Sequence, residues 1–281
     1  MKPVAAKNQE ELVNKVREKY GEIAKSSSSC CGPDPSGCGT GSADTLSISL
    51  GYDTETLESV PEEANLGLGC GVPIGHLELQ PGETVLDLGS GPGLDAFLAA
   101  QQVGESGHVI GVDMTPEMLT RAKENAKKMG VENVDFREGR LESLPVEDGS
   151  VDAVTSNCVI NLVPDKAVVF REVARVLKPG GRLVISDIVL DGRLPEAIEQ
   201  DIYAYVGCVS GAMQRKDYFD AVEAAGLGSV AILKDVDYGA GIMEAAPDEA
   251  RRLFEKAGAG VSKSDVVGKV RSVTFRAVKP H

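Results

Sequence analysis

The sequence predicts an α/β fold in which a mostly parallel sheet of seven strands carries helices on both faces. Short apolar runs alternate with segments of helical periodicity across residues 84–190, which is the order of elements in a parallel sheet with crossover helices. The segment at residues 151–158, "VDAVTSNC", combines apolar and small residues with a single charge, as expected for a strand covered on both faces. A glycine-rich turn, residues 89–93, joins the first of these strands directly to a helix.

The elements follow one another in a regular order. Pro116 lies in the first turn of the second helix of this region, and Gly130 is placed to end it. Strands are expected at residues 84–90, 108–114, 133–139, 151–158, 182–190, 229–238 and 270–279, and helices at residues 8–25, 94–103, 115–129, 167–177, 195–206, 216–225 and 247–258.

Three regions of the chain differ in composition. Residues 1–60 combine the first amphipathic helix, an expected lid, with a Ser/Gly/Pro-rich segment that holds Cys30, Cys31 and Cys38. Residues 61–190 carry the alternating strands and helices, and residues 191–281 add helices and the last two strands. The sequence therefore predicts a central α/β domain, with an N-terminal helix and loop before it and a C-terminal α+β addition after it.

Composition excludes several classes of partner. The net charge of −14 argues against a nucleic-acid partner, because phosphate binding needs clustered Lys and Arg. No apolar run is long enough to cross a bilayer, and the first residues lack the apolar core of a signal peptide. We therefore expect a cytoplasmic protein without a membrane partner, whose 6 cysteines are reduced and act as core residues, metal ligands or redox groups.

The glycine-rich turn indicates a nucleoside-type cofactor. Gly89, Gly91 and Gly93 let the backbone turn sharply and approach a ligand closely. Asp113 ends the second strand 20 residues after Gly93, where a carboxylate can accept hydrogen bonds from ribose hydroxyls. The competing interpretation is a tight turn accompanied by a surface aspartate.

Three motifs, "VLDLGSGPG", "VIGVDM" and "VLKPGG", together resemble those of the class I S-adenosylmethionine-dependent methyltransferases. The resemblance implies a Rossmann-like fold and S-adenosylmethionine as cofactor. Arg140 stands where many relatives carry an aspartate that binds the adenine amine. Carried over to this sequence, the resemblance implies a cofactor site of Asp87, Gly89, Ser90 and Gly91 at the methionine part, Asp113 at the ribose, and Met114, Leu141 and Asn157 further along the pocket.

Three further cysteines lie next to glycines or at the end of a strand. Cys158 follows the fourth strand, at the edge where open parallel sheets bind ligands. Cys70 lies between Gly69 and Gly71, and Cys208 follows a glycine in "AYVGCVSGA". Buried core cysteines are the first alternative. A structural zinc site is the second, although the C-x-x-C pairs typical of zinc are missing from the sequence. Thiolates also suit other soft, thiophilic centres, including trivalent arsenic.

The segments "NLGLGCG", "SNCVINLVPDK" and "YVGCVSGA", on this frame, resemble those of the arsenite methyltransferases. The resemblance implies that Cys70, Cys158 and Cys208 are the catalytic thiolates that bind As(III). It also implies a turnover role for an N-terminal cysteine, for which Cys30, Cys31 and Cys38 are the candidates. The implied partners are arsenite or its thiol complexes and a thiol reductant of the glutathione or thioredoxin type.

The sequence thus predicts an enzyme that transfers methyl groups from S-adenosylmethionine to trivalent arsenic. Two other functions remain open at this point. The first is a class I methyltransferase acting on a small organic acceptor, with incidental cysteines. The second is a thiol-based metalloid-binding protein that keeps a cofactor pocket without using it.

Overall fold

The computed structural model describes residues 6–26, 43–199, 209, 211–245 and 262–281. The N-terminal cysteines and Cys208 lie outside these residues, as do the helix expected at residues 247–258 and most of the helix expected at residues 195–206. In the described part of that last segment, a short helix, α7, covers Glu196–Glu199.

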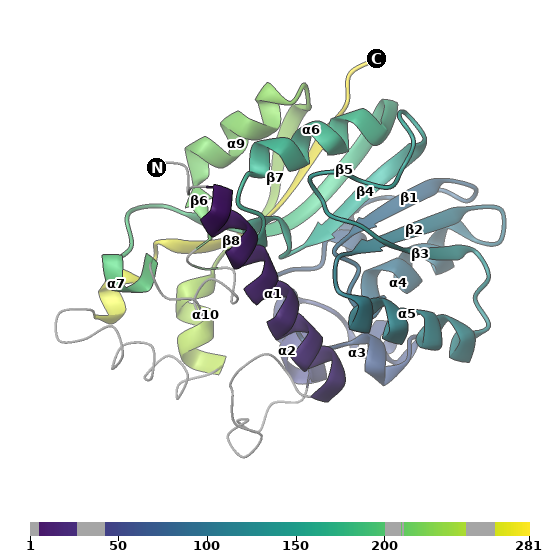
Figure 1. Cartoon of the computed structure of the whole chain (residues 1–281), viewed down its shortest axis with the longest axis horizontal. Helices are drawn as coiled ribbons and strands as arrows, with labels where there is room; N and C mark the ends of the chain where they lie inside the picture. The colour runs from purple at the N-terminus through teal and green to yellow at the C-terminus, as the bar shows by residue number, and fades with distance from the viewer. Residues whose placement is uncertain (1–5, 27–42, 200–208, 210, 246–261) are drawn as a thin grey trace.

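One mixed sheet forms the centre of the molecule (Figure 1). Its main path has the order β3-β2-β1-β4-β5-β8-β7, and a short β6 pairs with β5 beside this path. Strands β1 to β5 are parallel, whereas β8 runs antiparallel to both β5 and β7. The predicted seven-stranded, mostly parallel sheet is therefore confirmed, with β6 as an addition. The strands are β1 (Thr84–Leu88), β2 (His108–Asp113), β3 (Val134–Glu138), β4 (Val151–Asn157), β5 (Leu177–Leu190), β6 (Met213–Gln214), β7 (Gly228–Asp237) and β8 (Val270–Val278).

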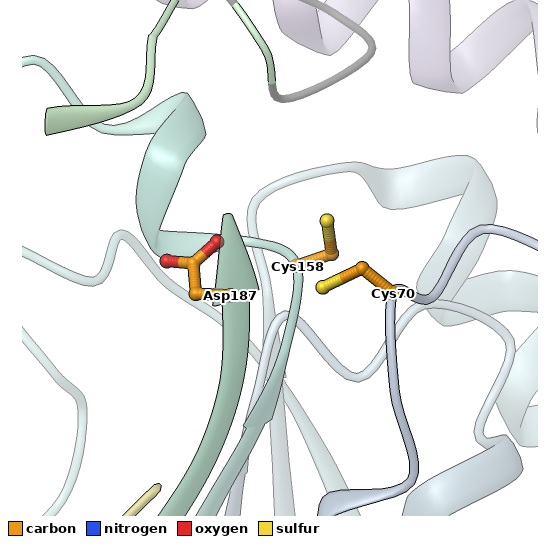
Figure 2. A group of neighbouring side chains, drawn as sticks. All are labelled: Cys70, Cys158 and Asp187. Atoms are coloured by element: carbon orange, nitrogen blue, oxygen red, sulfur yellow. The ribbon is translucent and has the colours of Figure 1, made fainter. Parts of the chain in front are cut away.

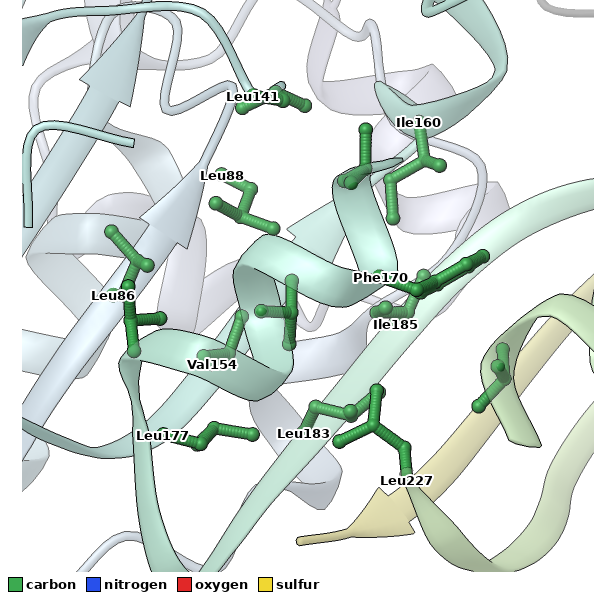
Figure 3. Close-up of a cluster of buried hydrophobic side chains, with 14 of the residues drawn as sticks. Leu86, Leu88, Leu141, Val154, Ile160, Phe170, Leu177, Leu183, Ile185 and Leu227 are labelled. Carbon is green, nitrogen blue, oxygen red and sulfur yellow. The ribbon is translucent and has the colours of Figure 1, made fainter. Parts of the chain in front are cut away.

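Helices cover both faces of this sheet. Phe170 of α6 (Lys166–Val176) packs in one core with Leu86 and Leu88 of β1 (Figure 3). Tyr218 of α9 (Arg215–Ala224) belongs to the same core. The neighbouring Val85 points to the opposite face, as the pleat of a strand requires. There it joins a second core with α4 (Leu94–Val103) and α5 (Pro116–Met129).

The ends of the central helices follow from local sequence. Pro116 opens α5, and Gly130, with φ of 66°, ends it in the left-handed conformation, as predicted. The carboxylate of Asp165 accepts hydrogen bonds from the backbone N–H groups of Ala167 and Val168, which caps the start of α6.

The N-terminal helix α1 (Ala6–Ser26) packs across α5. Arg121 donates a hydrogen bond of 2.9 Å to the carbonyl of Ala24, and Lys25 forms a 2.9 Å ion pair with Glu117. Val16, on the inner face of α1, is fully buried. Three further helices were not predicted from the sequence: α2 (Ala43–Leu50), α3 (Thr54–Glu58) and α10 (Tyr238–Ala245). Within the described ranges, none of the helices combines the length and the apolar character that a membrane crossing requires.

Candidate functional site

A cavity opens at the carboxyl ends of the parallel strands, where open α/β sheets bind their ligands. Its lining residues come from the turn after β1, the end of β2, the segment after β3 and the end of β4. Val13, Val16 and Tyr20 of α1 also line it. The predicted lid helix thus borders the cavity. All eight residues of the predicted cofactor site line it: Asp87, Gly89, Ser90, Gly91, Asp113, Met114, Leu141 and Asn157.

The turn after β1 depends on a glycine at its first position. Gly89 has φ of 66°, a conformation that residues with a side chain rarely adopt. A Cβ atom added there would lie 2.5 Å from a methyl carbon of Val159, which follows β4. Gly89 therefore allows this turn and the end of β4 to approach each other, and so closes one wall of the cavity.

Asp113 is held in a fixed orientation at the end of β2. Its two carboxylate oxygens accept hydrogen bonds from the backbone N–H groups of Gly91, at 3.0 Å, and Thr115, at 2.8 Å. Burial raises the pKa of Asp113, and these hydrogen bonds oppose that rise. The carboxylate thus connects the glycine-rich turn to the start of α5 and borders the cavity, where it can accept further hydrogen bonds.

Asp87, the last acidic residue of β1, is buried with part of its hydrogen-bonding capacity unused. Its Oδ2 atom and the hydroxyl of Ser90 have no hydrogen-bond partner among the described residues. Burial raises the pKa of Asp87 well above its usual range, and the nearby Asp95 and Asp113 raise it further. Unsatisfied buried polar atoms are costly, so this corner of the cavity favours a ligand that brings hydrogen-bond donors and positive charge.

Two residues of this site were not predicted, Tyr52 and Asp95. The Tyr52 hydroxyl donates a 2.6 Å hydrogen bond to Asp95 Oδ1, and Asn157 Nδ2 donates to Asp95 Oδ2 at 3.2 Å. Asn157 also donates to the carbonyl of Gly71 and accepts a 3.0 Å hydrogen bond from the backbone N–H of Cys70. Asn157 therefore connects the cavity to the segment that carries Cys70.

Cys70 and Cys158 lie side by side (Figure 2). Both are buried, with 1% and 5% of their surface exposed, and Cys158 lines the cavity itself. Their sulfur atoms and a carboxylate oxygen of Asp187, in β5, all lie within 4.8 Å of one another. The structure thus brings together two of the three predicted arsenic-binding cysteines. Cys208 lies outside the described residues, as do the turnover candidates Cys30, Cys31 and Cys38.

The backbone at both cysteines is fixed. Cys158 has φ of 61°, a left-handed conformation uncommon for a residue with a side chain, and its N–H donates a 2.8 Å hydrogen bond to the carbonyl of Ser186. The carbonyl of Cys70 accepts a 2.6 Å hydrogen bond from the hydroxyl of Ser272 in β8. The two thiols are therefore positioned by strands β4, β5 and β8.

Asp187 is a further residue of the site that was not predicted. Its Oδ2 accepts a 2.9 Å hydrogen bond from the Tyr218 hydroxyl, and its Oδ1 accepts one of 2.7 Å from Asn161 Nδ2. Burial raises the pKa of Asp187 to about 7, although these partners and the nearby Lys166 lower it. A carboxylate inside the apolar strand "VISDIVL" is the signal that could have revealed it, because buried charges usually have a specific partner or role.

Gly71 sets how closely the Cys70 segment approaches the sheet. A Cβ atom added at Gly71 would lie 2.5 Å from Ser186 Oγ and 2.8 Å from Ser186 Cβ. We expect Gly71→Ala to lower the free energy of unfolding by about 1–3 kcal/mol, the usual cost of overpacking, measured by urea denaturation. Gly75→Ala is the matched control, since its Cβ would meet only Val72, at 3.6 Å. Equal stability of the two variants would contradict the close packing described for Gly71.

Comparisons with known proteins agree with this architecture. The profile of a family described as "Methyltransferase domain" matches residues 79–258, which include the glycine-rich turn, Asp113 and Cys158. The chain therefore belongs to the methyltransferase-domain family, and its fold is that of the class I enzymes.

Within this family, the chain is similar to proteins named arsenite methyltransferases. It is 49% identical to the protein of Halobacterium salinarum, over 82% of this chain and 60% of that protein, and 37% identical to the one from Mus musculus, over 76% and 57%. An arsenic(III) S-adenosylmethionine methyltransferase from Chlamydomonas reinhardtii superposes with a TM-score of 0.62 at 32% identity, covering 86% of this chain and 75% of that one. The chain spans about 60% of the length of the curated relatives it matches.

Proposed function

We propose that this protein transfers methyl groups from S-adenosylmethionine to trivalent arsenic bound by cysteine thiolates. The observation that carries the proposal is the pair of buried thiols, Cys70 and Cys158, at the edge of the cavity that holds the predicted cofactor residues. The relatives named arsenite methyltransferases support it. A methyltransferase with an organic acceptor does not account for the two buried thiols, and a metalloid-binding protein does not account for the cofactor residues beside them.

The cavity residues fit the chemical groups of S-adenosylmethionine. The unpartnered Asp87 Oδ2 and Ser90 hydroxyl suit the donors of an α-ammonium group. The Asp113 carboxylate suits the two ribose hydroxyls, because it is already oriented by Gly91 and Thr115. Met114 and Leu141 supply apolar lining on the same side. When bound, the cofactor supplies a methyl group on a positively charged sulfur.

The thiols fit the chemistry of arsenite. Thiolates are soft ligands that suit a soft centre, and Cys208 is the proposed third ligand beside Cys70 and Cys158. When arsenic trihydroxide exchanges onto three thiols, each thiol proton leaves with a hydroxide as water. The arsenic keeps a lone pair, which would accept the methyl group of a bound cofactor, releasing S-adenosylhomocysteine and leaving a methylated, formally pentavalent arsenic. The chain's main contribution is to hold the two reactants in line and at contact distance.

We assign the N-terminal cysteines Cys30, Cys31 and Cys38 to turnover, with a thiol reductant of the glutathione or thioredoxin type. Two cysteine thiols would return the methylated, formally pentavalent arsenic to the trivalent state by giving up two electrons and forming a disulfide, which the reductant then cleaves. Because all these cysteines must stay reduced to act, we place the reaction in a reducing compartment such as the cytoplasm.

The decisive experiment is to incubate the purified protein with S-adenosylmethionine, glutathione and arsenite, and to separate the arsenic species by chromatography with mass detection. We expect methylated arsenic that depends on all three additions. Arsenite binding without methylated product would favour the metalloid-binding alternative. If neither binding nor product is found, while cofactor still binds, a methyltransferase with an organic acceptor becomes the better description.

A further inference from the structure

Asp187 gives the thiol pair a second type of ligand atom. The two sulfur atoms and the carboxylate oxygen come from three separate parts of the chain: the segment before β1, the turn after β4 and strand β5 (Figure 2). All three residues are buried. Two thiolates and a carboxylate together form a donor set that zinc-type cations accept.

We propose that Cys70, Cys158 and Asp187 form a binding site for a thiophilic divalent cation, Zn²⁺ or Cd²⁺. The competition between this cation and arsenic rests on the function proposed above, whereas the cation binding itself does not. Each bound cation displaces the protons of the two thiols into solvent. The bound cation therefore competes with arsenic for the two thiols.

The distances suit such a cation. Bond lengths of about 2.3 Å to sulfur and about 2.0–2.2 Å to oxygen place the ligand atoms of a tetrahedral zinc site roughly 3.5–3.8 Å apart. The three atoms already lie within 4.8 Å of one another, so they need to close by only about an ångström to meet these values. Three protein ligands leave one position for water or another ligand.

The carboxylate is oriented for this role by its neighbours. Tyr218 donates to one oxygen of Asp187 and Asn161 to the other, at 2.9 and 2.7 Å. Oδ1 also accepts a 3.0 Å hydrogen bond from the backbone N–H of Ile188, so Oδ2 is the oxygen that keeps a lone pair for a cation. Tyr218 itself is fixed in a cluster of aromatic rings with Phe170 and Phe275. Hydrogen bonds of this kind from outside the ligand shell orient a metal ligand and raise its affinity.

Arsenic and the divalent cation differ in the ligand atoms that they accept. Trivalent arsenic is a soft centre that takes sulfur, so the Asp187 oxygen is a poor ligand for it. Zn²⁺ and Cd²⁺ accept carboxylate oxygen together with thiolate sulfur. Changing Asp187 should therefore weaken cation binding and leave arsenite binding almost unchanged.

The test titrates the purified full chain with Zn²⁺ against a chromophoric chelator, without arsenite or cofactor. A parallel titration with Cd²⁺ follows the thiolate-to-cadmium charge-transfer absorption. Asp187→Asn keeps the shape of the side chain and should bind Zn²⁺ at least about a hundredfold more weakly, and Tyr218→Phe about tenfold more weakly. Cys158→Ser should lose the cadmium absorption. Asp220→Asn, an exposed carboxylate of α9, is the matched control and should bind like the unchanged protein.

Equal Zn²⁺ affinity for the unchanged protein, Asp187→Asn and Tyr218→Phe would overturn the proposal, as would cation binding that is equally weakened in Asp220→Asn. Binding of S-adenosylmethionine by each variant shows that it is folded. Arsenite affinity measured on Asp187→Asn should stay within about threefold of the unchanged protein, since sulfur ligands are retained. A protein that binds Zn²⁺ through Asp187 but does not bind arsenite would support this site and contradict the proposed function.

Discussion

The variant Cys158→Ser is expected to lose arsenite binding and arsenic methylation, while its affinity for S-adenosylmethionine stays nearly unchanged. Cys158 lies in the turn directly after β4, and its sulfur atom is one of the two that the structure brings together with Cys70. A hydroxyl oxygen is a poor replacement for sulfur on a soft centre. Arsenic bound to the protein after gel filtration, measured by mass spectrometry, and methylation rate together test this expectation. Cys70→Ser should behave in the same way.

The control for these variants is the triple replacement of Cys30, Cys31 and Cys38 by Ser. It removes three thiols of the chain but none of the proposed arsenic ligands, so it should still bind arsenite and complete a first methylation. Later rounds should slow, because thiol exchange and reduction then limit the rate. If Cys158→Ser methylates arsenite at the normal rate, Cys158 is a core residue and the thiolate site is wrong. If the triple variant loses arsenite binding, one of these three N-terminal cysteines is itself a ligand.

Asp113→Ala is expected to bind S-adenosylmethionine about tenfold to a hundredfold more weakly. A hydrogen bond to a charged acceptor contributes about 1.5–3 kcal/mol, and each 1.4 kcal/mol changes affinity about tenfold. The variant also removes the acceptor for the backbone N–H groups of Gly91 and Thr115, so the glycine-rich turn loses part of its support. Calorimetric titration with the cofactor measures both effects together.

Asp113→Asn separates these two effects, because an amide keeps one oxygen acceptor but no charge. The affinity of Asp113→Asn for S-adenosylmethionine should lie between those of the unchanged protein and Asp113→Ala. Asp135→Ala is the matched control, since Asp135 is a carboxylate of the adjacent strand β3 that pairs with Arg137 at the surface. Equal cofactor affinity for Asp113→Ala and Asp135→Ala would remove Asp113 from the cofactor site.

The parts of this site that depend on local sequence patterns could be predicted. The glycine-rich turn, Asp113 and Cys158 each follow a strand that can be recognised from its own residues, and parallel strands bring their carboxyl ends to one edge. Their place around a common cavity could therefore be predicted. The helices α2, α3 and α10 were missed, because they are short and tertiary contacts decide whether such segments are helical.

The parts that were missed depend on pairing between distant segments. Tyr52 and Asp95 meet through a hydrogen bond across 43 positions of sequence, and neither has a motif of its own. Asp187 reaches the thiols only because β5 lies beside β4 in the sheet. Its position within an apolar strand was visible, but the partner of that carboxylate depends on strand order, which one sequence does not reveal.

The hydrogen bond from Ser272 to the carbonyl of Cys70 has a consequence for how the protein is made. The two residues are 202 positions apart, and Ser272 belongs to β8, which enters the sheet between β5 and β7. During synthesis, the segment with Cys70 leaves the ribosome long before β8 does. We expect the strands and helices that carry the predicted cofactor site to fold first in the nascent chain. Cys70 and Cys158 should reach their final positions only after β8 has joined the sheet. Until then, Cys70 and Cys158 of the growing polypeptide do not yet form the proposed thiol site.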